Sequence, residues 1–232
     1  MLYINTIGQD QNLVLLHGWG FNADVFKPLI DRYSHAYRIS VIDLPGHGRS
    51  NEISGGLDHW CDEIIKIMPK NPILVGWSLG GLLAIKIATR IPVKKLVLIA
   101  STPKFVKSNN WEFGIDEQNF KEFSNNLNLN LSKGLKRFVS LQSTNKQTIK
   151  ILNQSIDRFP ATRSALNQGL KILLHTDLCD EFLNLSIEKQ VILGKKDTLV
   201  PNTIKTWYKD NNVKTTQLNT GHIPFLEAEF SL

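Results

Sequence analysis

The chain has 232 residues, of which 42% are hydrophobic, and its net charge is +6 at pH 7. This length allows one domain with a substantial core but hardly two independent domains. The apolar runs fall far short of the roughly 20 residues that cross a bilayer, and the N-terminus lacks a signal-peptide pattern. Cys61 and Cys179 are too few for a disulfide framework or a zinc site. We expect a cytoplasmic monomer that binds no metal, cofactor, nucleic acid or membrane.

Short runs of β-branched and aliphatic residues alternate with longer amphipathic stretches. This alternation is typical of βαβ units, in which helices connect the parallel strands of a sheet. The expected strands are residues 13–16, 39–42, 73–75, 96–99, 191–193 and 215–218. The expected helices are residues 57–68, 79–90 and 203–208. The pattern predicts an α/β fold with a mostly parallel central sheet flanked by helices.

The strand pattern stops at Pro103 and returns only after about residue 175. The sequence between them is helical and polar, and it holds 11 Lys and Arg against five Asp and Glu. The rest of the chain has 16 of each sign, so all of the excess positive charge lies in this segment. We interpret residues 104–175 as a helical cap, or lid, inserted into a core of residues 1–103 and 176–232.

A glycine-rich turn follows the expected strand 73–75 and precedes the helix that begins at Leu79. Its sequence, Gly-Trp-Ser-Leu-Gly-Gly at residues 76–81, has the G-x-S-x-G pattern of a nucleophile elbow in its strand-to-helix context. The glycines leave room for a tight turn, and the helix directs N–H groups towards developing negative charge. A plain tight turn and a phosphate-binding loop are the alternatives. In this context we predict that Ser78 is a catalytic nucleophile.

A serine hydroxyl needs a general base, which in turn needs a group that orients it. The chain order for this kind of site is serine, acid, histidine, which leaves His175 and His222 of the six histidines. His222 lies in a glycine-containing loop after the last expected strand. His175 ends an amphipathic stretch inside the cap, where a packing or surface role is expected. We therefore predict that His222 is the base.

The acid should follow a late strand and precede His222. Asp197 meets this condition, because it comes directly after the expected strand 191–193, although its position would also suit a helix N-cap. Asp177 and Asp180 are alternatives that precede this strand. We predict that Asp197 is the acid.

An oxyanion hole needs two N–H donors fixed where the negative oxygen forms. The N–H of Leu79, next to the nucleophile, is one expected donor. The N–H of Trp19 is the other, because the small residues around it in His-Gly-Trp-Gly (17–20) let that backbone approach closely. Asp43 and Arg49, in the turn after the strand 39–42, are interpreted as structural.

Together these motifs resemble the α/β-hydrolase superfamily over nearly all of the chain. Within it, the closer resemblance is to the biotin-pathway family of pimeloyl acyl-carrier-protein methyl ester esterases. The segments that carry it are His-Gly-Trp-Gly-Phe-Asn (17–22), Gly-Trp-Ser-Leu-Gly-Gly (76–81), Ala-Ser-Thr-Pro-Lys-Phe (100–105), Arg-Phe-Val-Ser-Leu-Gln (137–142) and Gly-His-Ile-Pro-Phe (221–225). The resemblance implies a serine esterase that removes the methyl group from a pimeloyl chain carried on acyl carrier protein.

The resemblance also implies site residues and a partner. The residues that would line the substrate site are Trp19, Ser78, Leu79, Phe138, Val139, Ser140, Leu141, Gln142 and His222. The partner would be an acidic carrier protein, which a positive cap attracts. Its expected contacts are Lys133, Arg137 and Lys150, and a merely solvated cap face is the alternative.

Other proteins with this fold are weighed against the same residues. A general short-chain carboxylesterase would use the same triad, as would a carbon–carbon lyase of menaquinone synthesis. The lyases tend to have a basic residue directly after the elbow glycines, where this chain has Leu82. A haloalkane dehalogenase would need aspartate in place of Ser78. A non-catalytic binding protein would usually lack a member of the triad, whereas this sequence keeps all three.

Overall fold

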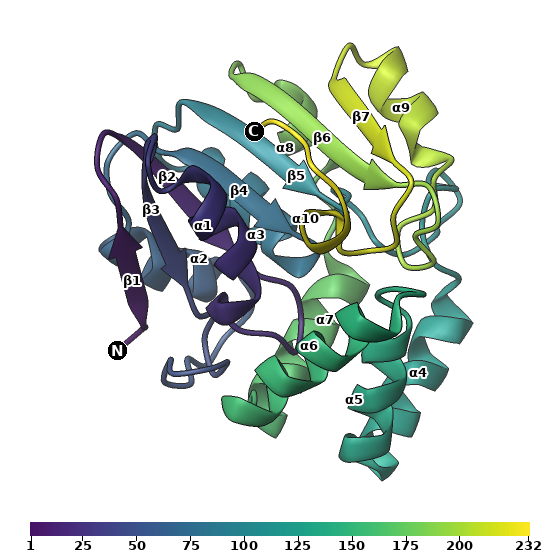
Figure 1. Cartoon of the computed structure of the whole chain (residues 1–232). Coiled ribbons are helices and arrows are strands. Elements are labelled where there is room, and N and C mark those ends of the chain that lie inside the picture. The colour runs from purple at the N-terminus through teal and green to yellow at the C-terminus, as the bar shows by residue number, and fades with distance from the viewer.

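The computed structural model describes the whole chain apart from the side chain of Asn128. Its centre is a seven-stranded sheet in the order β1-β3-β2-β4-β5-β6-β7 (Figure 1). β1 pairs antiparallel with β3, and the other neighbouring pairs are parallel. The strands are β1 (Ile4–Ile7), β2 (Gln11–Leu16), β3 (Tyr37–Ile42), β4 (Ile73–Trp77), β5 (Lys95–Ile99), β6 (Glu188–Gly194) and β7 (Lys214–Leu218).

The six expected strands are all present, each longer than predicted. β4 and β5 are buried along their whole length, which explains why they appear in the sequence as continuous apolar runs. β1 was not among the expected strands. It lies at the edge of the sheet and is half-buried to exposed, so its sequence lacks a long apolar run.

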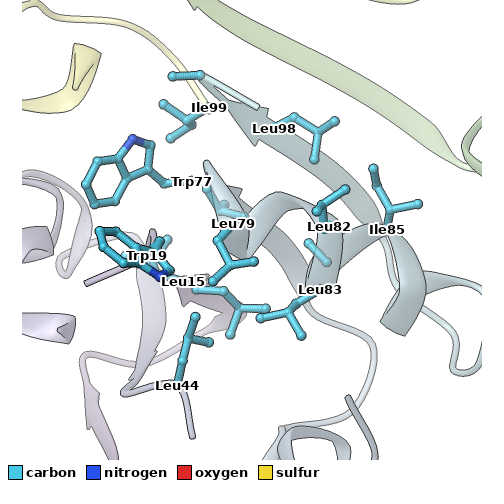
Figure 2. Packing of buried hydrophobic residues seen from close by; sticks show 14 of the residues in the cluster. Leu15, Trp19, Leu44, Trp77, Leu79, Leu82, Leu83, Ile85, Leu98 and Ile99 are labelled. Carbon is cyan, nitrogen blue, oxygen red and sulfur yellow. The ribbon is translucent and has the colours of Figure 1, made fainter. Parts of the chain in front are cut away.

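Helices cover both faces of the sheet (Figure 1). A short 3-10 helix, η1 (Ala23–Phe26), leads into α1 (Lys27–Tyr33), which packs against α10 (Pro224–Glu227) on one face. The opposite face carries α2 (Leu57–Ile67), α3 (Leu79–Ala88), α8 (Cys179–Asn184) and α9 (Ile204–Asp210). Figure 2 shows the leucines of α3 packed among Leu15 of β2 and Leu98 of β5. The expected helices correspond to α2, α3 and α9, whereas α1 and α8 are additional.

Four further helices lie between β5 and β6 in the sequence and gather beyond the carboxyl ends of the strands (Figure 1). They are α4 (Glu117–Leu129), α5 (Leu131–Ser140), α6 (Lys146–Arg158) and α7 (Arg163–His175). Each is preceded by an N-cap residue whose side chain accepts hydrogen bonds from backbone N–H groups of the first turn. These residues are Asp116, Asn130, Asn145 and Thr162. Two of the asparagines in this polar sequence therefore start helices. The division into a core and a cap at residues 104–175 stays a prediction.

The chain segments just before and just after these four helices lie next to each other. The N–H of Leu178 donates to the carbonyl of Pro103 over 3.0 Å. Beside this bond, Lys104 forms an ion pair with Asp177 at 2.7 Å. β5 and β6, which flank the excursion, are neighbours in the sheet. Among the described residues, none of the helices combines the length and hydrophobicity that spanning a membrane requires.

Candidate active site

Ser78 lies on a sharp turn between β4 and α3. Its φ of 53° and ψ of −120° are unusual for a residue with a side chain, and such strain persists only where surrounding structure holds it. The Ser78 N–H donates to the carbonyl of Ile99 at 3.1 Å, and the Ser101 hydroxyl donates to the Ser78 carbonyl at 2.7 Å. A side chain on Gly80 would overlap the Leu16 carbonyl, so the start of α3 needs glycine there. These contacts fix the backbone of Ser78 at the end of the sheet.

The structure brings Ser78, His222 and Asp197 together. His222 Nδ1 lies 2.8 Å from Asp197 Oδ2, and His222 Nε2 lies 2.9 Å from Ser78 Oγ. The carboxylate accepts a hydrogen bond, so Nδ1 carries the proton and Nε2 is left to accept from the Ser78 hydroxyl. All three residues are buried. This is the geometry of a nucleophile beside an oriented base.

Asp197 uses its two oxygens for different purposes. Oδ2 accepts from His222, while Oδ1 accepts from the N–H groups of Leu199 and Val200 at 2.8 and 3.0 Å. The residue therefore fixes its own turn as well as the imidazole. The alternative acids lie elsewhere, because Asp177 pairs with Lys104 and Asp180 lies in the first turn of α8.

The loop that carries His222 is held at its backbone by two segments. The N–H of His222 donates to the carbonyl of Gln142, just past the end of α5, at 2.8 Å. The indole N–H of Trp77, at the end of β4, donates to the carbonyl of His222 at 2.8 Å. The histidine is thus fixed both from the elbow and from the helices beyond the sheet. His175, the other candidate base, is exposed at the end of α7.

A cavity of about 360 Å³ reaches Ser78 from the side of the four helices. Its volume lies within the range of small-molecule sites. Most of its walls are aromatic and aliphatic, and residues three apart on α4, α5 and α7 contribute one face of each helix. The lining residues are Trp19, Ser78, Phe105, Ile115, Asn119, Phe120, Glu122, Phe123, Asn126, Gly134, Arg137, Phe138, Leu141, Leu170, Leu173, Thr198 and Leu199.

The predicted substrate residues fall into two groups. Trp19, Ser78, Phe138 and Leu141 line the cavity. The remaining predicted residues lie outside the lining. Leu79, Val139, Gln142 and His222 are fully buried, and Ser140 is exposed.

Much of the cavity wall was not predicted from the sequence. The pairs Phe120 with Phe123 and Leu170 with Leu173 have helical spacing, which is the signal that would have placed each pair on one helix face.

Trp19 connects the early loop to α7. Its indole N–H donates to the carbonyl of Leu166 at 2.8 Å, and its ring packs edge-on against Phe138 with centroids 4.7 Å apart. Figure 2 shows Trp19, Trp77 and Leu79 close together at the start of α3. Leu79 is the first residue of α3, where N–H groups have no acceptor within the helix. The oxyanion-hole roles of Trp19 and Leu79 stay predictions.

Asp43 and Arg49 form a buried network next to the early loop. Asp43 accepts from the N–H of Ala23 at 2.6 Å and from the backbone and guanidinium of Arg49 at 2.8 Å. Burial opposes the charge of Asp43, but the hydrogen bonds of Arg49 outweigh it and hold the pKa of this carboxyl below its usual range. These contacts fit the structural interpretation of both residues.

Two buried histidines adjoin this network. His17 Nδ1 donates to the Gly18 carbonyl, and its Nε2 accepts from the Leu44 N–H at 2.9 Å. His47 Nδ1 donates to the Pro45 carbonyl at 3.0 Å. Burial lowers the pKa of His17 to about 4 and that of His47 to about 3. Both rings are therefore neutral structural groups.

We expect the free energy of unfolding to fall as the pH decreases below about 6.5. In the unfolded chain His17 and His47 take up protons near pH 6.5, whereas in the folded chain they stay neutral to about pH 4 and 3. The unfolded chain then binds more protons, so each histidine lowers stability by up to about 1.4 kcal/mol per pH unit in this window. Urea unfolding at pH 7, 6 and 5 measures the slope.

Two matched variants separate this effect from the titration of other groups. His47→Asn keeps an N–H donor and should reduce the slope between pH 6.5 and 5. His35→Asn changes an exposed histidine and should leave the slope as it is. Equal slopes in the wild type and both variants would show that burial of His47 does not control acid stability.

A model of the Alpha/beta hydrolase family matches residues 13–230. The chain belongs to this family. Among its relatives, a pimeloyl-[acyl-carrier protein] methyl ester esterase from Shewanella woodyi is 40% identical, over 97% of this chain and 92% of the relative. A protein of the same name from Nitrosospira multiformis is 32% identical over the same shares.

Solved alpha/beta hydrolases have the same fold as this chain. An esterase from Exiguobacterium antarcticum superposes with a TM-score of 0.87 at 22% identity, over 95% of this chain and 88% of the other. A bromoperoxidase from Bacillus anthracis also reaches 0.87, at 18% identity, over 96% and 88%. The fold class and the family resemblance predicted from the sequence are confirmed. Among the described residues, no group of three or more potential metal ligands converges.

Proposed function

We propose that this chain is a serine carboxylesterase that hydrolyses the methyl ester of a pimeloyl group carried on acyl carrier protein. The observation that carries the proposal is the hydrogen-bonded series Ser78, His222 and Asp197 beside an apolar cavity. The esterase from Shewanella woodyi, at 40% identity, supports the substrate. A pimeloyl group has an unbranched run of methylene groups between two carbonyl carbons. The aromatic and aliphatic wall of the cavity suits that run.

Acylation follows from the positions of the three residues. Ser78 Oγ attacks the carbonyl carbon of the methyl ester while His222 Nε2 takes the hydroxyl proton. Asp197 stabilises the imidazolium that forms, and the N–H groups of Trp19 and Leu79 would receive the negative oxygen. His222 then gives its proton to the methoxy oxygen. Methanol leaves, and the pimeloyl group remains as an ester of Ser78.

Deacylation uses the same groups in reverse. His222 takes a proton from a water molecule, whose oxygen attacks the carbonyl carbon of the acyl-enzyme. The second tetrahedral intermediate collapses as His222 returns the proton to Ser78 Oγ. The product is a free carboxylate at the end of the chain that still bears the carrier.

The proposed carrier would bind over the positive helices. Lys133 and Arg137 lie one turn apart on α5, Lys150 lies on α6, and all three are exposed. Arg137 also lines the cavity, so it lies where a chain that runs from the carrier to Ser78 would pass. A positive surface of this kind would accelerate encounter with an acidic protein.

Charge reversal at Lys133 and Lys150 together should lower kcat/KM for carrier-bound ester and leave the free methyl ester unaffected. We expect a loss on the order of tenfold at low salt, because each exposed pair contributes roughly 0–1 kcal/mol. The loss should shrink as salt rises, since the screening length at physiological ionic strength is about 8 Å. Steady-state rates at several salt concentrations test this.

A control with the same charge change is available on α9. Lys205→Glu with Lys209→Glu reverses two exposed lysines far from the four helices (Figure 1). This variant should keep full activity on carrier-bound ester. Equal losses on carrier-bound and free esters in the Lys133 and Lys150 variant would indicate damage to the acyl site. No loss on either ester would leave these charges as solvated surface.

The substrate itself is tested by comparing kcat/KM for the pimeloyl methyl ester on acyl carrier protein with that for the free methyl ester. A clear preference for the carrier-bound ester supports the proposal. Equal values would favour a general short-chain carboxylesterase. Failure to hydrolyse either ester would overturn the proposal.

A further inference from the structure

Glu227 lies at the end of α10. Its carboxylate accepts hydrogen bonds from the residue before His222 and from the residue after Gln142, and the backbones of His222 and Gln142 are themselves hydrogen-bonded. Oε2 accepts from the N–H of Gly221 at 3.0 Å, in the loop that carries His222. Oε1 accepts from the hydroxyl of Ser143, the residue after Gln142. One side chain therefore links the histidine loop to the connection between α5 and α6.

The connection between α5 and α6 is itself ordered by Ser143. Its hydroxyl donates to Glu227 and accepts from the N–H of Asn145 at 2.8 Å. Asn145 in turn caps α6 through the N–H groups of its first turn. Ser143 is buried and Glu227 is half-buried, so these hydrogen bonds are partly shielded from water.

The histidine loop needs such an outside anchor. Gly221 has no side chain, and a Cβ at this position would overlap the carbonyl of Gln142. The His222 N–H can reach that carbonyl because the two backbones approach closely at Gly221. The same close approach leaves no room there for a side chain that could hold the loop by packing. Misplacement of a reacting group by about 1 Å can cost about 10²-fold in rate.

We propose that Glu227 is a positioning residue that holds His222 at hydrogen-bond distance from Ser78. It acts by fixing Gly221, next to His222, and Ser143, next to Gln142, and so it holds the hydrogen bond between the His222 N–H and the Gln142 carbonyl in place. Its carboxylate is engaged with these two groups, so it takes no part in the chemical steps. The inference rests on the proposed roles of Ser78 as nucleophile and His222 as base.

The test is the rate at which a fluorophosphonate labels Ser78, because this reaction requires the base but no acyl-chain recognition. Glu227→Ala should lower the labelling rate constant on the order of 10- to 100-fold. The final extent of labelling should stay complete. For a free methyl ester, kcat should fall while KM stays nearly constant. Glu227→Gln keeps one acceptor oxygen and should recover part of the rate.

Ser143→Ala provides a milder second variant, since it removes one hydroxyl and leaves Glu227 on Gly221. It should lower the labelling rate by a smaller factor. If both residues act through one link, the double variant should be no slower than Glu227→Ala alone. Glu229→Ala is the matched control, because Glu229 is exposed and its carboxylate pairs with Arg32 at 3.4 Å, away from the loop that carries His222.

The outcomes separate three cases. A wild-type rate constant in Glu227→Ala would overturn the positioning role. Incomplete labelling at the wild-type rate would show that Glu227 only maintains the fold, and would overturn it too. Failure of the wild-type protein to label at Ser78 would overturn the proposed function itself.

Discussion

Ser78→Ala is expected to abolish ester hydrolysis, with a loss in kcat on the order of 10⁴- to 10⁶-fold. The substitution removes the oxygen that forms the acyl-enzyme, which His222 Nε2 contacts at 2.9 Å. The backbone bonds of residue 78 with Ile99 and Ser101 do not involve this oxygen. The melting temperature should therefore change little. Hydrolysis of a free methyl ester and thermal unfolding of the same preparation measure both.

Two further variants make this result specific. His222→Ala should be nearly as severe as Ser78→Ala, and the double variant little worse than either, because the residues act as a unit. Ser132→Ala changes an exposed serine on α5 and should retain full activity. Residual activity above a few percent in Ser78→Ala would exclude Ser78 as the nucleophile.

Asp197→Asn should lower kcat on the order of 10⁴-fold with little change in KM. An asparagine can present its NH₂ group to His222 Nδ1, which then loses its proton to Nε2. The imidazole in that form cannot accept the proton of Ser78. The substituted side chain can still accept from the N–H groups of Leu199 and Val200, so the turn should survive. Steady-state kinetics on a free methyl ester measure the loss.

Asp177→Asn is the matched control for this substitution. Asp177 forms its ion pair with Lys104 at the surface, and its replacement should leave turnover unchanged. Unchanged turnover in Asp197→Asn would contradict the assignment and return Asp177 and Asp180 as candidates for the acid.

The sheet and the candidate triad were predictable because their signals are local. The central strands are buried on both faces, so each is a continuous apolar run that stands out without knowledge of its neighbours. Ser78 lies in a pattern that combines glycine spacing with a strand and a helix. Once the serine is placed, chain order leaves few positions for His222 and Asp197. Their hydrogen bonds agree with that reasoning.

The cavity and its supports were not predictable in the same way, because they depend on contacts between distant segments. Three of the four helices, α4, α5 and α7, contribute residues to the cavity wall, so the packing of distant segments decides which of residues 138–142 face it. The sequence resemblance placed all five at the substrate, whereas only Phe138 and Leu141 line the cavity. The hydrogen bond between Ser143 and Glu227 joins residues 84 positions apart. No local pattern marks either partner of such a bond.

The hydrogen bond between Pro103 and Leu178 bears on how such a scaffold can be modified. β5 and β6 pair directly, and the segment that holds the four helices begins and ends where Pro103 meets Leu178. The four helices could therefore be exchanged for a different inserted segment. A shorter replacement would close with less loss of chain entropy. The exchange has one condition. The new segment must place a backbone carbonyl where that of Gln142 accepts the hydrogen bond from the His222 N–H. A replacement that provides this carbonyl would keep His222 in its position beside Ser78. A replacement without it would need another hydrogen-bond acceptor for the His222 N–H.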